Sequence, residues 1–242
     1  MKFSKEYKEI SGDASYRKFY RNKKKNSILV YAKQEKKQNL LVYDAINKIL
    51  IKNKILSPRL LKQNYNDNFI EIQDLGKETI YQILKKKKIN NYLIFKKIIT
   101  TLNSIQKIKD QKIKNFKGKV YKIKKYDNNI LFNETKLFSE WYMSSKLSKN
   151  QCNRFNLEFN YHIKFLLSKL HFKNQTFVHR DFHVSNLMYF QNSIGLIDSQ
   201  DALIGNRAYD LASLVDDVRL KTSKKFKKKI YNYYLNNNKD IK

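Results

Sequence analysis

Short runs of alternating apolar and polar residues dominate the amino-terminal third of the chain, and this alternation is typical of β-strands. The stretches SYRKFYR (residues 15–21) and SILVYAK (27–33) flank the polar segment NKKKN. Two strand-like runs around a short polar turn predict a β-hairpin. Farther on, NFIEIQDLG alternates Ile70 and Ile72 with Phe69, Glu71 and Gln73 and stops at Gly76, which predicts a third strand.

A helix is expected between the hairpin and this strand. Val42, Ala45, Ile46 and Ile49 fall at i, i+3, i+4 and i+7, which places them on one face of a helix over residues 38–52. The chain's single proline, Pro58, marks a break after it. The amino-terminal part therefore has a β-β-α-β pattern.

From residue 77 onward the pattern becomes mainly helical, with short strands around residues 177–202. The expected helices cover residues 78–86, 91–108, 131–146, 152–171, 208–219 and 224–236. No linker rich in Pro, Gly or Ser separates the two regions. We therefore expect an α+β fold of two lobes, a small antiparallel-sheet lobe over residues 1–76 and a mainly helical lobe over residues 77–242.

The composition limits what the charge implies. The net charge is +30, but only 7 of the 51 basic residues are Arg, and Lys, Asn, Ile, Tyr and Phe are all abundant. A+T-rich codons would produce this composition, so the charge indicates a solvated surface more than a dedicated nucleic-acid site. Few Arg residues are available for bidentate contacts to bases.

The sequence favours a protein of the reducing cytosol without a membrane segment. Cys152 is the only cysteine, so no intrachain disulfide can form. The first residues lack the apolar stretch of a signal peptide, and no apolar run approaches the roughly 18 residues needed to span a bilayer. A cytoplasmic location is therefore expected.

Polar residues with a specific spacing interrupt the apolar stretch FVHRDFHVSNLMYFQNSIGLIDSQDA (residues 177–202). Asp181 follows His179 by two residues, Asn186 lies five residues farther on, and a predicted hairpin then delivers Asp198. Phosphoryl transfer needs a carboxylate at the attacking hydroxyl and hard oxygen ligands for Mg²⁺. This pattern therefore predicts Asp181 as the base and Asn186 and Asp198 as ligands of magnesium.

The neighbouring polar residues have more than one interpretation. His179 is typical of a core histidine when considered alone. His183 could contact substrate or order the loop. Asp201 could be a third acid on the metal or substrate side, or a loop carboxylate. Asp210 is placed to point back toward the loop from the start of a helix, or to cap that helix.

The series HRDFHVSN, LIDSQDA and YDLASL resembles the aminoglycoside phosphotransferase and choline kinase superfamily, which shares its bilobal fold with protein kinases. SGDASYRKFYR, EIQDLG and NETKLFSEWY resemble more narrowly the anomeric kinases of N-acetylmuramate and N-acetylglucosamine, which act in bacterial cell-wall recycling. The resemblance covers residues 11–219.

The resemblance implies further roles. It places ATP phosphates under a turn, adenine against the hinge backbone of Gln73 to Leu75, and the sugar beside three residues of the helical lobe. The turn consists of Gly12, Asp13, Ala14, Ser15 and Tyr16, and the sugar-side residues are Glu134, Glu140 and Trp141. An aromatic face and carboxylates suit a polyhydroxylated ring, although Trp141 could equally be an aromatic that packs helices.

The chain also departs from the family pattern. Ser199 stands where the family phrase has an aromatic residue, and Gln73 replaces an acid. The strand lysine that pairs with phosphates in many kinases has its nearest candidate in Lys33, with Lys18 as a second. The chain ends sooner after YDLASL than these kinases usually do. It is thus either a shortened or an incomplete version, and the resemblance does not extend to the wall that the carboxy terminus gives the sugar site.

Together these features predict an ATP- and Mg²⁺-dependent kinase that phosphorylates the anomeric hydroxyl of a small amino sugar. Two alternatives remain open. One is another phosphotransferase of this fold, acting on an aminoglycoside or choline; the other is a non-catalytic kinase-like module that binds RNA. A basic chain suits a polycationic aminoglycoside poorly, and the presence of Asp181, Asn186 and Asp198 favours catalysis over a degenerate module.

Overall fold

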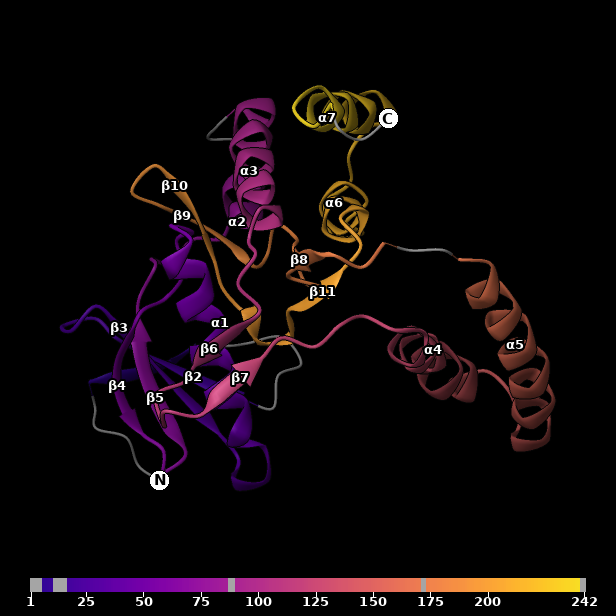
Figure 1. The fold of residues 1–242 in the computed structure, drawn as a ribbon, viewed down its shortest axis with the longest axis horizontal. Helices are drawn as coiled ribbons and strands as arrows, with labels where there is room; N and C mark the ends of the chain where they lie inside the picture. Colours follow the sequence, from indigo (N-terminus) through magenta and orange to yellow (C-terminus); the bar gives the residue numbers. More distant parts are fainter. Residues whose placement is uncertain (1–5, 11–16, 87–89, 171–172, 240–242) are drawn as a thin grey trace.

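The structure is a computed structural model that describes residues 6–10, 17–86, 90–170 and 173–239. It consists of an antiparallel sheet from the amino-terminal part and a mainly helical remainder (Figure 1). The α+β architecture expected from the sequence is confirmed.

The main sheet has five strands in the order β1-β2-β3-β5-β4, with every neighbouring pair antiparallel. The strands are β1 (Tyr7–Ile10), β2 (Arg17–Asn22), β3 (Ser27–Ala32), β4 (Leu60–Asn64) and β5 (Phe69–Gln73). The β2–β3 hairpin forms as predicted. Its turn is closed by Asn22, whose Oδ1 accepts from the backbone N–H groups of Lys24 (3.1 Å) and Lys25 (3.2 Å).

Helix α1 (Gln38–Lys52) joins the sheet to the helical part. Leu40 and Tyr43 pack on the buried face of the sheet with Val30 and Ile70. Farther along the helix, buried apolar residues such as Ile46 belong to the large core of the helical part. One amphipathic helix thus contacts both parts of the molecule.

The helical part contains six further α-helices and three two-stranded sheets among the described residues. The helices are α2 (Ile80–Lys85), α3 (Asn91–Gln106), α4 (Asn128–Leu137), α5 (Lys149–Lys169), α6 (Ala208–Val215) and α7 (Lys224–Asn236). The small sheets pair β6 (Lys112–Lys114) with β7 (Val120–Lys122), β8 (Thr176–Val178) with β11 (Leu203–Gly205), and β9 (Leu187–Phe190) with β10 (Ser193–Leu196). Short helical turns are η1 (Gln34–Lys36), η2 (Phe138–Tyr142), η3 (Met143–Ser145) and η4 (Ser199–Asp201).

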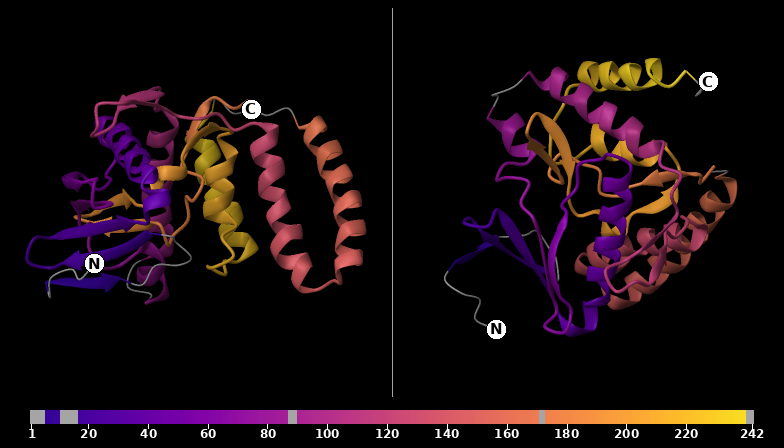
Figure 2. Two further views of the ribbon diagram at one scale, coloured as in Figure 1. Left: turned by 90° about the horizontal axis from the view of Figure 1, so that it is seen from below. Right: turned by 60° about the vertical axis from the view of Figure 1, so that its left-hand side comes forward.

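Helix α3 lies at the centre of the main core. One face of it is fully buried, including Phe95 and Ile98. Helix α7 covers α3, with Phe226 edge-on to Phe95 at a centroid distance of 5.2 Å. Helices α4 and α5 instead form a hairpin that stands to one side (Figure 2). Of the 21 residues of α5, only Leu167 is buried.

Several elements differ from the sequence prediction. Strand β4 was not predicted, because it lies at the sheet edge and exposes three of its five residues, so its sequence shows no alternation. Strands β1, β6 and β7 were also missed, since three or four residues are too short to establish a period.

The predicted helix over residues 131–146 was wrong in part. α4 ends at Leu137 and continues as the π-helix η2 and the 3-10 helix η3. Hydroxyl groups there donate to carbonyls of the preceding turn, as Ser139 does to Lys136 (3.0 Å) and Ser145 to Tyr142 (2.8 Å). Such bonds compete with the regular helical pattern.

None of the helices in the described ranges is long and apolar enough to cross a bilayer. The expected lobe boundary at residue 76 stays a prediction, since α1 shares its apolar residues between both parts.

Removing a buried side chain from α3 should destabilise the whole fold. Ile98 is 0 % exposed, and replacing it by Ala is expected to lower the free energy of unfolding by about 2–5 kcal/mol, because the cavity cannot fully collapse. Leu93→Ala on the same helix, at a side chain that is 55 % exposed, should change it by less than about 0.5 kcal/mol. Urea unfolding followed by circular dichroism measures both, and equal effects would contradict a core centred on α3.

Candidate active site

A buried carboxylate at the start of α6 holds the loop that follows β8. Asp210 accepts hydrogen bonds from the backbone N–H of His179 (2.7 Å) and of Arg180 (3.0 Å). Arg180 has a φ of +74°, a conformation that a side chain with a Cβ rarely adopts. Two charge-assisted bonds to consecutive amides can hold this backbone in place. Asp210 therefore points back at the loop, which is one of the two roles considered from the sequence.

Burial perturbs both ionisable groups at this anchor. It raises the pKa of Asp210 to about 7, although the two N–H donors act in the opposite direction. It lowers the pKa of His179 to about 4, so this imidazole is neutral at physiological pH. The His179 ring packs edge-on against Phe182 at a centroid distance of 6.2 Å, in agreement with a core histidine.

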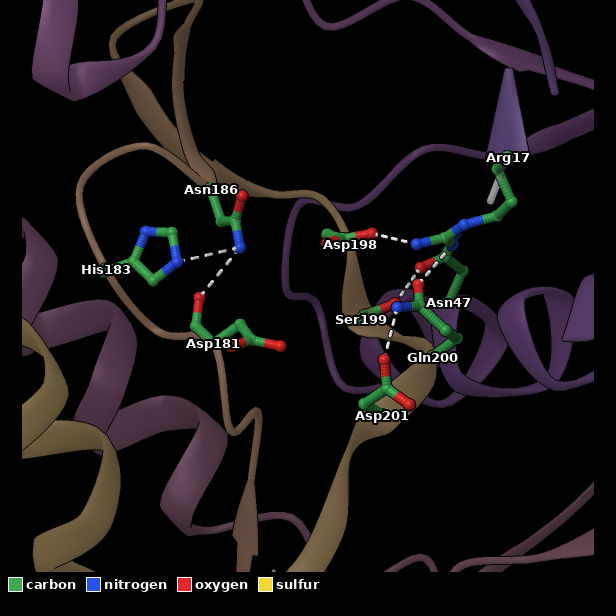
Figure 3. Close-up of polar contacts among 9 residues, drawn as sticks. All are labelled: Arg17, Asn47, Asp181, His183, Asn186, Asp198, Ser199, Gln200 and Asp201. Atoms are coloured by element: carbon green, nitrogen blue, oxygen red, sulfur yellow. Dashed lines mark hydrogen bonds and ion pairs between the residues drawn. The ribbon is translucent and has the colours of Figure 1, made fainter. Parts of the chain in front are cut away.

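Residues 179–186, called the HRD loop below, place Asp181, His183 and Asn186 together (Figure 3). The Asn186 side-chain amide donates from Nδ2 to the backbone carbonyl of Asp181 (3.2 Å), and Nδ2 lies 3.3 Å from His183 Nε2. Burial lowers the pKa of His183, with the charge of Arg219 as the next cause. A neutral His183 can accept from Asn186 at Nε2, which fits its loop-ordering interpretation.

The β9–β10 hairpin brings Asp198 to the HRD loop. A two-residue turn at Gln191 (φ +48°) and Asn192 (φ +63°) closes it, and the backbone N–H of Ile197 donates to the carbonyl of Asn186 (3.1 Å). Asp198 itself is left-handed, with a φ of +62°. The hairpin, which forms as predicted, thus places Asp198 close to Asn186, twelve residues earlier in the sequence.

The Asp181 carboxylate is directed toward the segment that carries Asp198 (Figure 3). Burial raises the pKa of Asp181, and the negative charges of Asp198 and Asp201 raise it further. A carboxylate with a raised pKa is a better proton acceptor than a free aspartate.

Residues 198–201, the Asp198 turn below, are tied to the amino-terminal part by side-chain contacts (Figure 3). Arg17 at the start of β2 forms an ion pair with Asp198, and its Nη1 donates to Gln200 Oε1 (2.6 Å). Gln200 Nε2 in turn donates to the carboxylate of Asp201 (2.6 Å).

Ser199, where the family pattern has an aromatic residue, is fully buried and donates to Asn47 of α1 (2.6 Å). The same Asn47 oxygen accepts from Ser57 (2.8 Å), and its Nδ2 donates to the carbonyl of Pro58 (3.2 Å). A small buried hydroxyl thus joins the Asp198 turn to a polar network on α1.

The donor set fits a magnesium ion that is shared with phosphates. Asn186 donates from Nδ2 to the HRD loop, so Oδ1 on the opposite side of its amide can face a metal ion. Asp198 provides a second oxygen donor, a carboxylate that is 36 % exposed. Mg²⁺ is usually bound by one or two protein oxygens together with substrate phosphates and waters. The described residues contain no cluster of three or more acidic, His or Cys ligands.

The expected sugar-side residues fall into two groups. Glu134 on α4 lies at the HRD loop, since it forms an ion pair with Arg180 and accepts from the Tyr126 hydroxyl. Glu140 and Trp141 lie on η2 at the tip of the α4–α5 hairpin, and Trp141 is 77 % exposed. The carbonyl of Trp141 accepts from the Ser144 hydroxyl of η3 (3.2 Å). Among the described residues, no hydrogen bond or ion pair joins Glu140 or Trp141 to the HRD loop.

The expected hinge is held by an ion pair between Arg21 of β2 and Asp74 (Nε to Oδ2, 2.6 Å). Asp74 also accepts from the N–H of Gly76 (2.9 Å). Gln73 ends β5, and Leu75 is 3 % exposed. This arrangement fixes the backbone of the segment where the resemblance places adenine.

The remaining expected nucleotide contacts are divided. The turn from Gly12 to Tyr16 lies outside the described residues. Lys33 follows β3 and is exposed, as is Lys18 on β2. The described contacts of the Asp198 turn include Arg17 and neither lysine.

Sequence reasoning missed Arg17. One signal could have drawn attention to it, because only 7 of the 51 basic residues are Arg, and Arg suits a buried ion pair better than Lys does. The role of Asp210 needed the fold, since its two partners are 30 and 31 residues away in the sequence.

Comparison with known proteins agrees with this geometry. Residues 6–240 match the family described as "Phosphotransferase enzyme family". The chain belongs to this phosphotransferase family.

Curated relatives within it include an N-acetylmuramate/N-acetylglucosamine kinase of Neisseria meningitidis, 24% identical over 220 residues, and one of Pseudomonas aeruginosa, 25% identical over 208 residues. These matches cover 89% and 86% of this chain but 63% and 58% of the relatives. The chain therefore spans about three fifths of their length.

Solved structures of phosphotransferases share the fold. Aminoglycoside phosphotransferase APH(2'')-Ib with bound ADP aligns over 98% of this chain and 79% of its own, with a TM-score of 0.65 and 16% identity. Choline kinase LicA from Streptococcus pneumoniae aligns over 94% and 74%, with a TM-score of 0.64 and 12% identity. The kinase-like fold expected from the sequence is thus confirmed.

Replacing Asp210 by Asn should change how stability depends on pH. With a folded pKa of about 7 and an unfolded pKa of about 3.9, Asp210 contributes stability that falls as pH rises between these values. His179, with a folded pKa of about 4, contributes stability that rises with pH up to its unfolded pKa of about 6.5. The two slopes offset each other in the native chain.

Of these two slopes, the Asp210→Asn variant keeps only that of His179. Between about pH 4.5 and 6.5, its free energy of unfolding should therefore rise with pH more steeply than that of the native chain, by up to about 1.4 kcal/mol per unit. Urea titrations at several pH values test this. Asp216→Asn, at a side chain that is 52 % exposed, serves as the control and should run parallel to the native curve. If Asp210→Asn also ran parallel, Asp210 would not be buried with a raised pKa.

Proposed function

We propose that this chain is an ATP-dependent kinase that transfers the γ-phosphoryl group to the anomeric hydroxyl of N-acetylmuramate or N-acetylglucosamine. The observation that carries the proposal is the meeting of Asp181 with Asn186 and Asp198 at the end of the β9–β10 hairpin. The curated relatives, which are named N-acetylmuramate/N-acetylglucosamine kinases, supply the substrate class.

In this mechanism Asp181 accepts the proton of the attacking hydroxyl. Burial and the neighbouring acids raise its pKa, which makes it a better proton acceptor than a free aspartate. Asp210 fixes the loop backbone, and Asn186 with His183 fixes the approach of Asp181 through its carbonyl. Since the transition state of phosphoryl transfer is loose, positioning contributes more than activation of the nucleophile.

The nucleotide lies between the amino-terminal sheet and the HRD loop. The hinge at Gln73 to Leu75 would contact adenine, and residues 12–16, which lie outside the described residues, stay the predicted contacts of the phosphates. Solved neighbours of this fold carry ADP or ATP, which supports ATP as the donor. Asn186 and Asp198 would hold Mg²⁺, which would supply positive charge beside the phosphates.

The sugar lies on the other side of Asp181. Glu134 and Asp201 flank the HRD loop through Arg180, which pairs with Glu134 and donates to the carbonyl of Asp201 (3.5 Å). We assign these two acids to the sugar hydroxyls. Glu140 and Trp141 stay predictions, because they lie at the hairpin tip.

Purified protein with Mg-ATP should convert N-acetylmuramate or N-acetylglucosamine to the sugar 1-phosphate. The anomeric hydroxyl is more acidic than the others because the ring oxygen withdraws electron density, so one carboxylate can assist its attack. A coupled assay against both sugars, choline and kanamycin identifies the acceptor, and phosphorus-coupled NMR identifies the position. A 6-phosphate, or turnover of choline or kanamycin alone, would contradict the proposal.

Two substitutions should separate the base from the metal ligand. Asp181→Asn is expected to lower kcat by about 10²–10⁴-fold, because the base is lost, while ATP affinity stays within a few-fold. Asp198→Ala should instead remove the dependence of ATP binding on Mg²⁺. Isothermal titration with ATP, with and without Mg²⁺, measures binding apart from turnover. Equal loss of Mg-ATP affinity in both variants would reject the division of roles.

A further inference from the structure

We propose that Arg17 is the residue that binds the nucleotide phosphates in this chain, in place of a strand lysine, and that it pairs with Asp198 only while no nucleotide is bound. The inference rests on the proposed kinase function for its ligand. It assigns to one arginine two successive anionic partners, the metal-binding carboxylate and the phosphate.

Arg17 is built into the fold with its charged group aimed at the site. It is the first residue of β2, directly after the turn expected over the phosphates. Its side chain is 4 % exposed. The guanidinium lies 5.6 Å from the ring centroid of Phe19 and 5.8 Å from that of Tyr43. The two aromatic rings and the burial shield the guanidinium from water. Its terminal N–H groups donate to Asp198 and Gln200.

The two lysines suggested by the sequence are placed differently. Lys18 follows Arg17 in the same strand, so its side chain leaves from the opposite face of the sheet, and it is exposed. Lys33 lies beyond the end of β3 and is also exposed. Arg180, the other cation that contacts the Asp198 turn among the described residues, is already paired with Glu134.

An exchange of partners satisfies the charges in both states. A buried guanidinium needs an anion, since leaving it unpaired is strongly destabilising. Without nucleotide, Asp198 is that anion. When metal and nucleotide bind, Asp198 turns its carboxylate to the metal, and the planar guanidinium of Arg17 can bind a phosphate in a bidentate manner. The bond from Arg17 to Gln200 can persist in both states, because it uses the other terminal nitrogen.

Asp198 is suited to move in this exchange. Its side chain is 36 % exposed, nine times the 4 % of Arg17. It stands at the left-handed junction before η4, so rotation of its side chain leaves the buried contacts of Ser199 and Gln200 intact. The buried arginine remains in position while the carboxylate changes partner.

The first test compares nucleotides that differ only in phosphate number. Affinities for ATP, ADP, AMP and adenosine are measured by isothermal titration, without sugar, for Arg17→Gln, Arg17→Lys, Lys33→Gln and Lys18→Gln, with Lys25→Gln in the exposed β2–β3 turn as a control for lost charge. Arg17→Gln should weaken ATP and ADP about 10–100-fold, the effect of losing a charged hydrogen bond, and leave adenosine unchanged. Arg17→Lys should recover part of this loss.

Two results would overturn the assignment. Equal weakening of all four ligands by Arg17→Gln would show that Arg17 only holds the two parts together. A loss specific to ATP and ADP in Lys33→Gln or Lys18→Gln, but not in Arg17→Gln, would return the role to a lysine. Thermal unfolding of each variant shows whether the protein measured is folded.

The second test releases Arg17 from its carboxylate. In the absence of metal, Asp198→Asn should bind ATP more tightly than the native chain, because Arg17 is no longer paired with a carboxylate. The gain should vanish when Arg17 is absent: the Arg17→Gln, Asp198→Asn double variant should bind ATP no more tightly than Arg17→Gln alone. An unchanged metal-free affinity in Asp198→Asn would reject the exchange of partners. Neither test includes a sugar, so both measure nucleotide binding even if the protein does not phosphorylate sugars. Failure of these binding tests would likewise leave the proposed sugar kinase activity untouched.

Discussion

The buried carboxylate of Asp210 is the interaction on which the geometry of the site depends. By accepting from two consecutive backbone amides, it holds Arg180 in a left-handed conformation. The direction of Asp181 and the reach of Arg180 to Glu134 both follow from that backbone. Burial raises the pKa of Asp210, so holding its ionised carboxylate in the core lowers the stability of the fold. Such a cost is common where the positioning of residues determines the chemistry.

The Asp198 turn is positioned in two ways. Local structure joins it to the HRD loop, and long-range contacts join it to the amino-terminal part. The β9–β10 hairpin places Asp198 beside Asn186 by strand pairing alone. The amino-terminal part is attached to the same turn by Arg17, from β2, and by Asn47, from α1. Because α1 also packs on both cores, the position of the Asp198 turn and the relative position of the two parts depend on the same residues.

What the sequence could predict follows from the range of the interactions. The Asp181, Asn186 and Asp198 arrangement lies within one loop and one hairpin, so its spacing carries the geometry. The Arg17 contact to Asp198 spans 181 residues, and only the register of β2 decides that Arg17, rather than Lys18, faces the site. For the same reason, periodicity indicated a helix around Glu140 and Trp141 but could not show that these residues lie on a π-helix at the tip of the α4–α5 hairpin.

The α4–α5 hairpin has a consequence for dynamics. Most of a helix's stability in a protein comes from tertiary packing of its apolar face. Helix α5 buries a single residue and exposes large side chains such as Leu157 and Tyr161. Its amides should therefore exchange with solvent through local opening, at a free energy well below that of global unfolding. The ion pair from Arg180 to Glu134 lies on α4. Fraying of the hairpin at α4 would break this ion pair and release Arg180, so local opening of the hairpin would also alter the HRD loop.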